Sequence, residues 1–305
     1  MKDINTPIKF DKKNEIYIND GEINSIKISN DKIFIANDNS IVIYDKNNFE
    51  QLQILKNKND LNFYDIVIVN DNFITSTFQR IYFYEYKKEE KLFHEKYNKK
   101  CHSRLINKLT LLSNGNLITC CLDEKKIKIW EKNENNEYQN ITILNHIDWI
   151  QNFFVLEKNN LFVSIGEKIT KFWNINNFQL IKEFDEIGCN SNNSVDKINN
   201  NEIIIGGCYN CQMYIISIKD KIERKKVIDN NSICLCICAF IDKQIFLVGG
   251  QNLNINVYQN YDDYKLINCI NDAHFDYILG ITKLNNNQFI SYSYDKLIRI
   301  WEINI

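Results

Sequence analysis

Three copies of one set of side chains in the sequence could carry hydrolytic chemistry. Each set contains a histidine, a hydroxyl residue, a carboxylate and a tryptophan. The sets are His102, Thr119, Asp123 and Trp130; His146, Ser164, Glu167 and Trp173; and His274, Ser291, Asp295 and Trp301. Serine, histidine and an acid are the groups of a hydrolase triad. One active site needs only one such set, whereas a structural role explains why the set recurs. We therefore interpret the three sets as structural and predict that the chain is not an enzyme.

The cysteines offer a second kind of chemistry. Cys208 and Cys211 form a CxxC pair in a predicted turn, with Cys189 expected in a loop at the same end of the repeat. A structural zinc site normally has four ligands, and the sequence shows no second pair beside this one. Free cysteine buries well as a small hydrophobe, and this is our interpretation of three residues that alternate along one predicted strand face, Cys234, Cys236 and Cys238. We predict no metal site and no cofactor.

The composition limits the partners and the compartment. The formal net charge is −2, from 37 basic and 39 acidic residues, which gives no reason to expect attraction to nucleic acid or to an anionic membrane. The first residues, MKDINTPIKF, lack the apolar stretch of a signal peptide. Ten cysteines without such a signal indicate reduced thiols. We expect a cytoplasmic or nuclear protein that does not bind nucleic acid and does not insert into membranes.

The elements that would position these side chains repeat along the chain. Each unit has two apolar runs separated by polar turns and then an alternating strand, most clearly in HFDYILGITKL, NNNQ, FISYSY, DK and LIRIWE. These third strands close 40 to 46 residues apart, at Tyr44, Tyr84, Trp130, Trp173, Ile216, Tyr258 and Trp301. A period of roughly 40–45 residues with four strands per unit is typical of β-propellers. The sequence therefore predicts an all-β, seven-bladed propeller with four antiparallel strands per blade, formed by one domain over residues 1–305.

Each unit also needs a fourth strand after its closing residue. Six candidates are residues 52–55, 92–95, 141–144 and 223–228, together with Leu180–Phe184 and Leu266–Ile270. The seventh unit has only four residues after Trp301, whereas residues 15–18 form an unassigned strand ahead of the first unit. We predict that residues 15–18 pair beside the strand ending at Trp301 and close the ring, which leaves no free sheet edge there.

The repeats resemble those of the WD-repeat family over essentially the whole chain. The resemblance rests on the runs NHIDWI and SYSYDKLIRIW, and on a histidine four residues before an isoleucine in the pairs His102/Ile106, His146/Ile150 and His274/Ile278. In WD repeats the loop histidine, strand hydroxyl, turn acid and strand tryptophan form a hydrogen-bonded tetrad in which each buried polar group satisfies the next. The resemblance implies this role for the three sets above. Units one, two, five and six depart from the pattern because they lack the histidine.

The resemblance also implies where a partner would bind. In WD propellers the residues after the loop histidine and those before the turn acid meet on one rim. By position these are Arg104, Leu105, Trp149, Tyr209, Gln251, Tyr277 and Tyr294. Four of the seven are aromatic, and Tyr and Trp are enriched at binding hot spots. For Trp149 the alternative is packing against its own blade.

These observations favour a protein-interaction function. We expect a scaffold or adaptor that binds a peptide or domain of another protein on this rim. Two alternatives remain open: the substrate receptor of a ubiquitin ligase complex, and an enzyme acting at the central channel. The predicted inner strands, such as NKLTLL, IQNFFVL and LCICAF, provide few polar groups for the enzyme.

Overall fold

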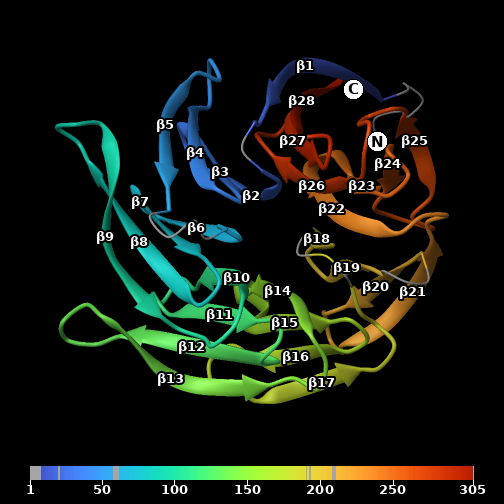
Figure 1. Ribbon diagram of the computed structural model, residues 1–305. Helices are drawn as coiled ribbons and strands as arrows, with labels where there is room; N and C mark the ends of the chain where they lie inside the picture. Colours follow the sequence, from blue (N-terminus) through green and yellow to red (C-terminus); the bar gives the residue numbers. More distant parts are fainter. Residues whose placement is uncertain are drawn as a thin grey trace. The chain divides into compact units, whose positions relative to one another are not determined.

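The structure is a computed structural model that describes residues 8–19, 21–57, 62–189, 191, 194–207 and 211–304. These residues form β-strands and two short 3-10 turns, η1 (Glu157–Asn159) and η2 (Ile241–Lys243). The strands make seven separate four-stranded antiparallel sheets (Figure 1). The predicted fold class, a seven-bladed β-propeller with four antiparallel strands per blade, is confirmed. The chain divides into two compact units, residues 20–192 and residues 1–19 with 193–305. The prediction of a single domain stays a prediction.

The unit of residues 20–192 contains blades one to four, each formed by consecutive strands. Their bounds are β2 (Ile23–Ile28), β3 (Lys32–Asn37), β4 (Ser40–Asp45) and β5 (Gln51–Lys56); β6 (Asp65–Val69), β7 (Asn72–Ser76), β8 (Arg80–Lys87) and β9 (Leu92–Lys100); β10 (Ile106–Leu111), β11 (Leu117–Cys121), β12 (Lys126–Lys132) and β13 (Tyr138–Asn145); and β14 (Ile150–Leu156), β15 (Leu161–Gly166), β16 (Thr170–Asn174) and β17 (Leu180–Phe184).

The second unit contains blades five to seven. Their bounds are β18 (Val195–Asn199), β19 (Glu202–Gly206), β20 (Gln212–Ser217) and β21 (Glu223–Asp229); β22 (Cys234–Phe240), β23 (Ile245–Gly250), β24 (Ile255–Gln259) and β25 (Leu266–Ile270); and β26 (Ile278–Lys283), β27 (Gln288–Ser293) and β28 (Leu297–Asn304), with β1 (Lys9–Tyr17) as the fourth strand of blade seven. All six predicted outer strands lie within the fourth strands of blades one to six.

The N-terminal strand completes the blade that the C-terminal strands begin. In the antiparallel register of β1 and β28, Glu15 lies opposite Arg299 and Tyr17 opposite Leu297, and Figure 1 shows the two strands side by side. The Nε of Arg299 donates a 2.6 Å hydrogen bond to Oε2 of Glu15, which joins the two ends of the chain across the sheet. The predicted pairing of residues 15–18 with the last strand is therefore confirmed.

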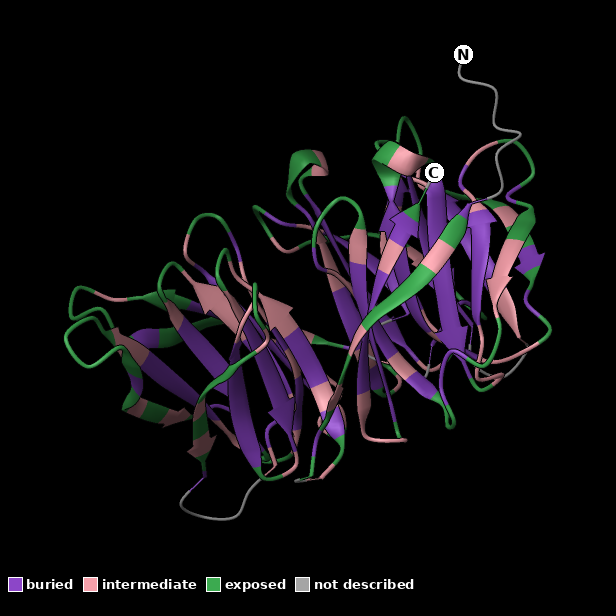
Figure 2. Cartoon of the chain, turned by 90° about the horizontal axis from the view of Figure 1, so that it is seen from above, coloured by how far each residue is buried: buried purple, intermediate pink, exposed green. Residues whose placement is uncertain are grey.

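Burial differs systematically between the middle and the outer strands. The second strands β15, β19 and β23 are buried at every residue, whereas the outer strand β5 is largely exposed. Figure 2 shows the same contrast as purple strand interiors against green edges and loops. Strands covered on both faces favour continuous β-branched and aromatic runs, whereas strands with one wet face alternate. Runs such as IFIAN and LFVSIG are of the first kind.

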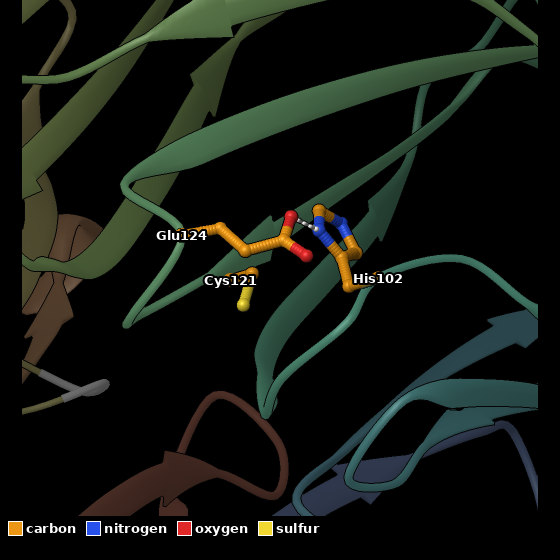
Figure 3. Close-up of side chains that lie close together, drawn as sticks. All are labelled: His102, Cys121 and Glu124. Atoms are coloured by element: carbon orange, nitrogen blue, oxygen red, sulfur yellow. Dashed lines mark hydrogen bonds and ion pairs between the residues drawn. The ribbon is translucent and has the colours of Figure 1, made fainter.

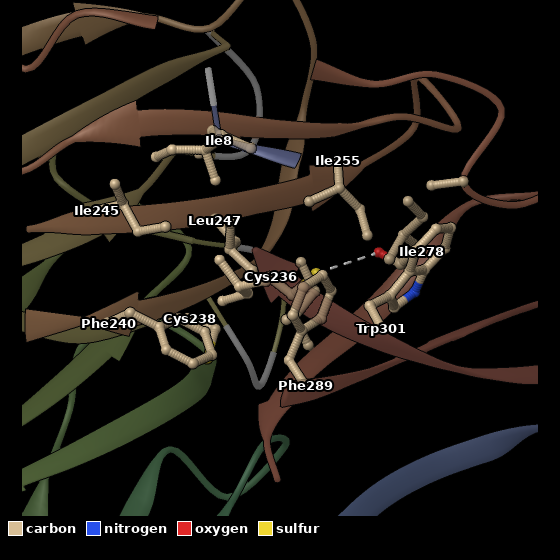
Figure 4. Close-up of a cluster of buried hydrophobic side chains, with 14 residues drawn as sticks. Ile8, Cys236, Cys238, Phe240, Ile245, Leu247, Ile255, Ile278, Phe289 and Trp301 are labelled. Carbon is tan, nitrogen blue, oxygen red and sulfur yellow. Dashed lines mark hydrogen bonds between the residues drawn. The ribbon is translucent and has the colours of Figure 1, made fainter. Parts of the chain in front are cut away.

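The core of blades six and seven shows how the cysteines are used. Phe289 stacks on Trp301 with ring centroids 6.2 Å apart, and Cys236 and Cys238 are buried in the same cluster (Figure 4). Cys234 instead packs with residues of blade five, because the strand register shifts between Cys234 and Cys236. The three cysteines are buried as small hydrophobes. The prediction that all three share one strand face is wrong, because the β-bulge between Cys234 and Cys236 places Cys234 in a different cluster from the other two.

Candidate functional site

The four residues singled out in blade seven form one continuous hydrogen-bonded series. His274 lies ahead of β26, Ser291 is on β27, Asp295 is in the following turn and Trp301 is on β28. The Nε2 of His274 lies 2.7 Å from Oγ of Ser291, and its Nδ1 lies 2.9 Å from Oδ2 of Asp295. The indole Nε1 of Trp301 donates a 2.8 Å hydrogen bond to the same Oγ of Ser291.

This series is poorly suited to nucleophilic catalysis. Ser291 is fully buried and His274 is almost completely buried. A nucleophile must reach the atom that it attacks, and the serine oxygen is covered on one side by the histidine and on the other by the tryptophan. The arrangement does satisfy every buried polar group in it, which removes the cost of leaving such groups unpaired.

Blade three has the same series with a different acid. His102 Nε2 lies 2.9 Å from Oγ1 of Thr119, which also accepts the indole N–H of Trp130 at 2.9 Å. The residue at 2.7 Å from His102 Nδ1 is Glu124, so the assignment of Asp123 to this set is wrong. Hydroxyl and tryptophan are 11 residues apart here and 10 apart in blade seven. Because this turn is one residue longer, the acid that contacts the histidine is Glu124, the residue after Asp123.

Blade four uses an acid from the other loop. Trp173 Nε1 donates a 2.8 Å bond to Ser164 Oγ, nine residues away, so this turn is one residue shorter than in blade seven. The acid beside His146 is Asp148, with Oδ1 2.6 Å from Nδ1, and the assignment of Glu167 to this set is wrong. Asp148 follows the histidine by two residues, and its Oδ2 accepts the backbone N–H groups of residues 168 and 169. Within the described part of the chain, neither ring nitrogen of His146 nor Oδ1 of Asp148 makes a hydrogen bond, so blade four keeps only the Trp173–Ser164 bond of the series.

Gly166 leaves the space that Asp148 occupies beside His146 in blade four. A Cβ atom at that position would lie 2.0 Å from Oδ1 of Asp148, so any other residue would push the carboxylate away from the ring. Asp148, in the loop after the histidine, therefore takes the place in blade four that the turn residue Asp295 has in blade seven, and Gly166 leaves the space for it.

Burial and hydrogen bonding set the protonation of the blade-three pair. Burial lowers the pKa of His102 to about 4, despite its bond to Glu124. Burial works to raise the pKa of Glu124, but the hydrogen bonds from Ser103 and His102 outweigh it and lower the pKa to about 2. Neutral imidazole therefore faces an ionised carboxylate at neutral pH. In blade seven, burial of Asp295 is likewise outweighed by its bonds to His274 and to the backbone of Phe275, and its pKa is lowered.

Two aspartates on the first strands of blades were not predicted as notable. Asp65 on β6 is almost fully buried and accepts the hydroxyl of Ser25 at 2.8 Å, with Nζ of Lys27 and of Lys108 at 3.6 and 3.8 Å. Burial of Asp65 is outweighed by the two ammonium groups, chiefly that of Lys108, so its pKa is lowered. Asp196 on β18 accepts the backbone N–H of Ala239 at 2.8 Å, and no ammonium group among the described residues forms an ion pair with it. Burial raises its pKa to about 6, although the charge of Lys283 acts in the opposite direction.

The residues predicted to bind a partner are solvent-accessible to different degrees. In the unit of residues 20–192, Trp149 is 46% exposed, Arg104 is exposed and Leu105 is half-buried. In the other unit, Tyr277 and Tyr294 are 40% and 41% exposed with ring centroids 6.4 Å apart, and Gln251 is exposed. Tyr209, with the CxxC residue Cys208, lies outside the described residues.

Phe275, which was not among the predicted binding residues, is 73% exposed and lies two residues before Tyr277. Its backbone N–H donates a 3.0 Å bond to Asp295, and the guanidinium of Arg299 lies 4.8 Å from its ring centroid. Its position directly after His274 could have identified it as a binding residue, because residues just after the loop histidine were predicted to contact a partner.

Comparison with known proteins agrees with the fold. The family model described as "WD domain, G-beta repeat" matches residues 94–131, which include His102, Thr119 and Trp130. A chain of the "Crystal Structure of Mitotic Checkpoint Complex" matches with a TM-score of 0.84 at 10% sequence identity, over 100% of this chain and 95% of that chain. No curated protein sequence matches this one. The chain therefore contains one stretch that matches the WD-repeat model, and its fold is that of a seven-bladed β-propeller.

Within the described residues, no helix has the length and apolar character needed to cross a bilayer.

Proposed function

We propose that this propeller is a protein-interaction scaffold and that exposed aromatic residues beside its histidine loops contact the partner. WD-repeat propellers generally serve as interaction scaffolds and are typically not enzymes. The observation that carries the proposal is the group of Phe275, Tyr277 and Tyr294 in blade seven, three large exposed aromatic side chains on two neighbouring loops. Aromatic residues supply much of the binding energy of protein interfaces.

The buried tetrad gives this group a fixed platform. Phe275 follows His274 directly and Tyr294 precedes Asp295, so the His274–Asp295 hydrogen bond ties the two loops together. The backbone N–H of Tyr294 also donates to the carbonyl of Tyr277 at 3.2 Å. Side chains held on a rigid backbone lose less entropy when a partner binds. The tetrad therefore acts in binding through the loops that it positions, and not through direct contact.

Blade three and blade four offer a second candidate surface in their own unit. Ile147 and Trp149 flank Asp148 and are 62% and 46% exposed, while Asp148 is anchored to the backbone at residues 168 and 169. An apolar pair on an anchored loop has the same physical character as the blade-seven group. Arg104 and Leu105 complete the proposed contacts of this unit.

The proposal extends to the setting in which the chain works. Every cysteine among the described residues is a free thiol, which fits a reducing compartment. We place the scaffold in the cytoplasm or nucleus, with protein partners.

The test is capture of partners from a lysate of the source organism with the purified chain and its alanine variants. Tyr277→Ala, Tyr294→Ala and Trp149→Ala are compared with Leu266→Ala, which truncates a side chain that is 53% exposed on the outer strand β25. Loss of a hot-spot aromatic costs about 2 kcal/mol or more, or roughly thirtyfold in affinity. Retention of every partner by all three aromatic variants, with folding confirmed, would reject the proposal.

A further inference from the structure

Blade three brings together three metal-ligating side chains that are distant in the sequence. His102 precedes β10, Cys121 ends β11 and Glu124 lies in the turn after it. Their ligand atoms all lie within 4.8 Å of one another. Figure 3 shows the Glu124 carboxylate facing the His102 ring, with Cys121 beside Glu124 and its sulfur directed away from the ring in this view. We propose that His102, Cys121 and Glu124 form a binding site for a thiophilic divalent ion of the zinc type.

The donor set suits such an ion. Zinc binds imidazole nitrogen, thiolate sulfur and carboxylate oxygen, and sites with three protein ligands keep a fourth position for water. Calcium and magnesium prefer oxygen ligands alone, so the nitrogen and sulfur donors select against them. Thiolate and carboxylate together carry two negative charges, which balance the charge of the ion.

Metal binding requires a neutral imidazole, an ionised carboxylate and a thiolate. Burial raises the pKa of the Cys121 thiol to about 11, while hydrogen bonds from the backbone of Glu124 and Asp123 act in the opposite direction. The ion would bind the thiolate and release one proton to solvent, as cysteine ligation does elsewhere.

His102 can coordinate the ion through Nδ1 once its ring proton has moved to Nε2. Coordination through Nδ1 leaves the ring proton on Nε2, which lies 2.9 Å from Oγ1 of Thr119 and can donate to it. Metal-bound histidines usually donate their second N–H to an oxygen in this way. Glu124 is oriented in turn by Ser103, whose backbone N–H and hydroxyl both donate to Oε1.

Blade seven also has a histidine–acid pair, so this pair alone does not define the proposed metal site. Ser293 ends β27 at the position that Cys121 has at the end of β11, two residues after the tetrad hydroxyl in each case. The Ser293 hydroxyl donates to the carbonyl of Asp276 and accepts the N–H of Asp295. In blade four the equivalent residue is Gly166. Of these three equivalent positions only that of blade three carries sulfur, so among the three described histidine loops only this one has the full donor set.

One neighbouring cation competes with the proposed ion. Nζ of Lys128 lies 3.8 Å from Oε2 of Glu124 and donates to the carbonyl of Cys101 at 2.7 Å. Like charges repel, so the lysine weakens metal binding at this site. The proposal therefore predicts that Lys128→Met binds the ion more tightly than the wild type.

The experiment uses the reduced, metal-free full chain titrated anaerobically with Co²⁺ and then with Zn²⁺. The expected result is one equivalent of Co²⁺ with a sulfur-to-cobalt charge-transfer band, which Zn²⁺ displaces. Cys121→Ser, which copies the residue of blade seven, should fold normally and lose the band. Ser103→Ala should keep the band and bind about tenfold more weakly, as loss of a ligand's hydrogen-bond partner typically does.

The Cys208→Ser/Cys211→Ser variant is the matched control for the other cysteine pair and should keep the band. Absence of the band in the wild type, its persistence in folded Cys121→Ser, or its loss in the Cys208→Ser/Cys211→Ser variant would each overturn the proposal. Circular dichroism of the metal-free variants separates loss of ligation from loss of folding.

Discussion

Ser291 accepts the indole N–H of Trp301 at 2.8 Å from ten residues away, and this spacing determines which residue completes the series. The corresponding spacing is 11 residues in blade three and nine in blade four. With the longer turn the acid is Glu124, and with the shorter one it is Asp148 from the opposite loop. Turn length differs wherever the acid beside the histidine differs, and in blade four the glycine at position 166 also leaves room for Asp148.

Replacement of the blade-seven histidine should destabilise the fold. His274→Ala removes the ring that joins Ser291 to Asp295, so that Ser291 keeps only its bond from Trp301 and Asp295 keeps only backbone donors. An incompletely satisfied buried polar group costs about 1–3 kcal/mol. The free energy of unfolding from urea titration measures this loss. His94→Ala, at a half-exposed side chain on β9, is the control and should change stability little. Equal stability of the two variants would contradict a structural role for the tetrad.

The assignment of the blade-three acid can be tested by a pair of neighbouring substitutions. Glu124→Gln removes the charge that faces His102, and we expect it to lower the free energy of unfolding by about 1–3 kcal/mol. Asp123→Asn should have almost no effect, because the carboxylate beside the ring belongs to Glu124. Chemical denaturation in the presence of a chelator makes the comparison independent of metal. A larger effect of Asp123→Asn would show that the turn has a different register.

Asp196 should make the protein less stable as the pH rises. Its pKa in the folded chain is about 6, above the ordinary value of 3.8, so folding disfavours the ionised form. The penalty is absent below the unfolded-state pKa and fully present above the folded-state pKa, so stability falls between about pH 4 and pH 6. Two pKa units correspond to on the order of 3 kcal/mol. Asp196→Asn should therefore be more stable than the wild type at pH 7 and equal to it near pH 3.

The measurement is the difference in free energy of unfolding between wild type and Asp196→Asn across this pH range. Asp65→Asn provides the contrast, because its carboxylate lies between Lys27 and Lys108 and its pKa is lowered. Removal of one partner from buried charges typically costs about 3–5 kcal/mol, so this variant should be less stable than the wild type at pH 7. A constant difference for Asp196→Asn at all pH values would show that Asp196 titrates normally.

The blades could be predicted from the sequence because their evidence is repeated. The closing residues from Tyr44 to Trp301 recur at nearly constant spacing, and the runs IKIW and IRIW of two third strands alternate with the period of a β-strand. The role of residues 15–18 could be predicted because the seventh unit lacked a fourth strand and these residues formed a strand that belonged to no other unit.

The details of the site depend on single-residue differences that a repeat pattern averages out. One residue more or less in a turn exchanged Asp123 for Glu124 and Glu167 for Asp148. A β-bulge moved Cys234 away from Cys236. Register within a strand or turn is fixed by packing and local geometry that the hydrophobic pattern does not record.

The measurement that tests the central claim most directly is site-specific photo-crosslinking. A photoreactive phenylalanine analogue replaces Tyr277 in one variant and Leu266 in a control, and both variants are irradiated in a lysate of the source organism. Both positions are exposed in the same unit, at 40% and 53%. The account predicts a covalent adduct with a partner protein from position 277 and none from position 266. A co-purifying partner that crosslinks from position 266 and not from position 277 would contradict it.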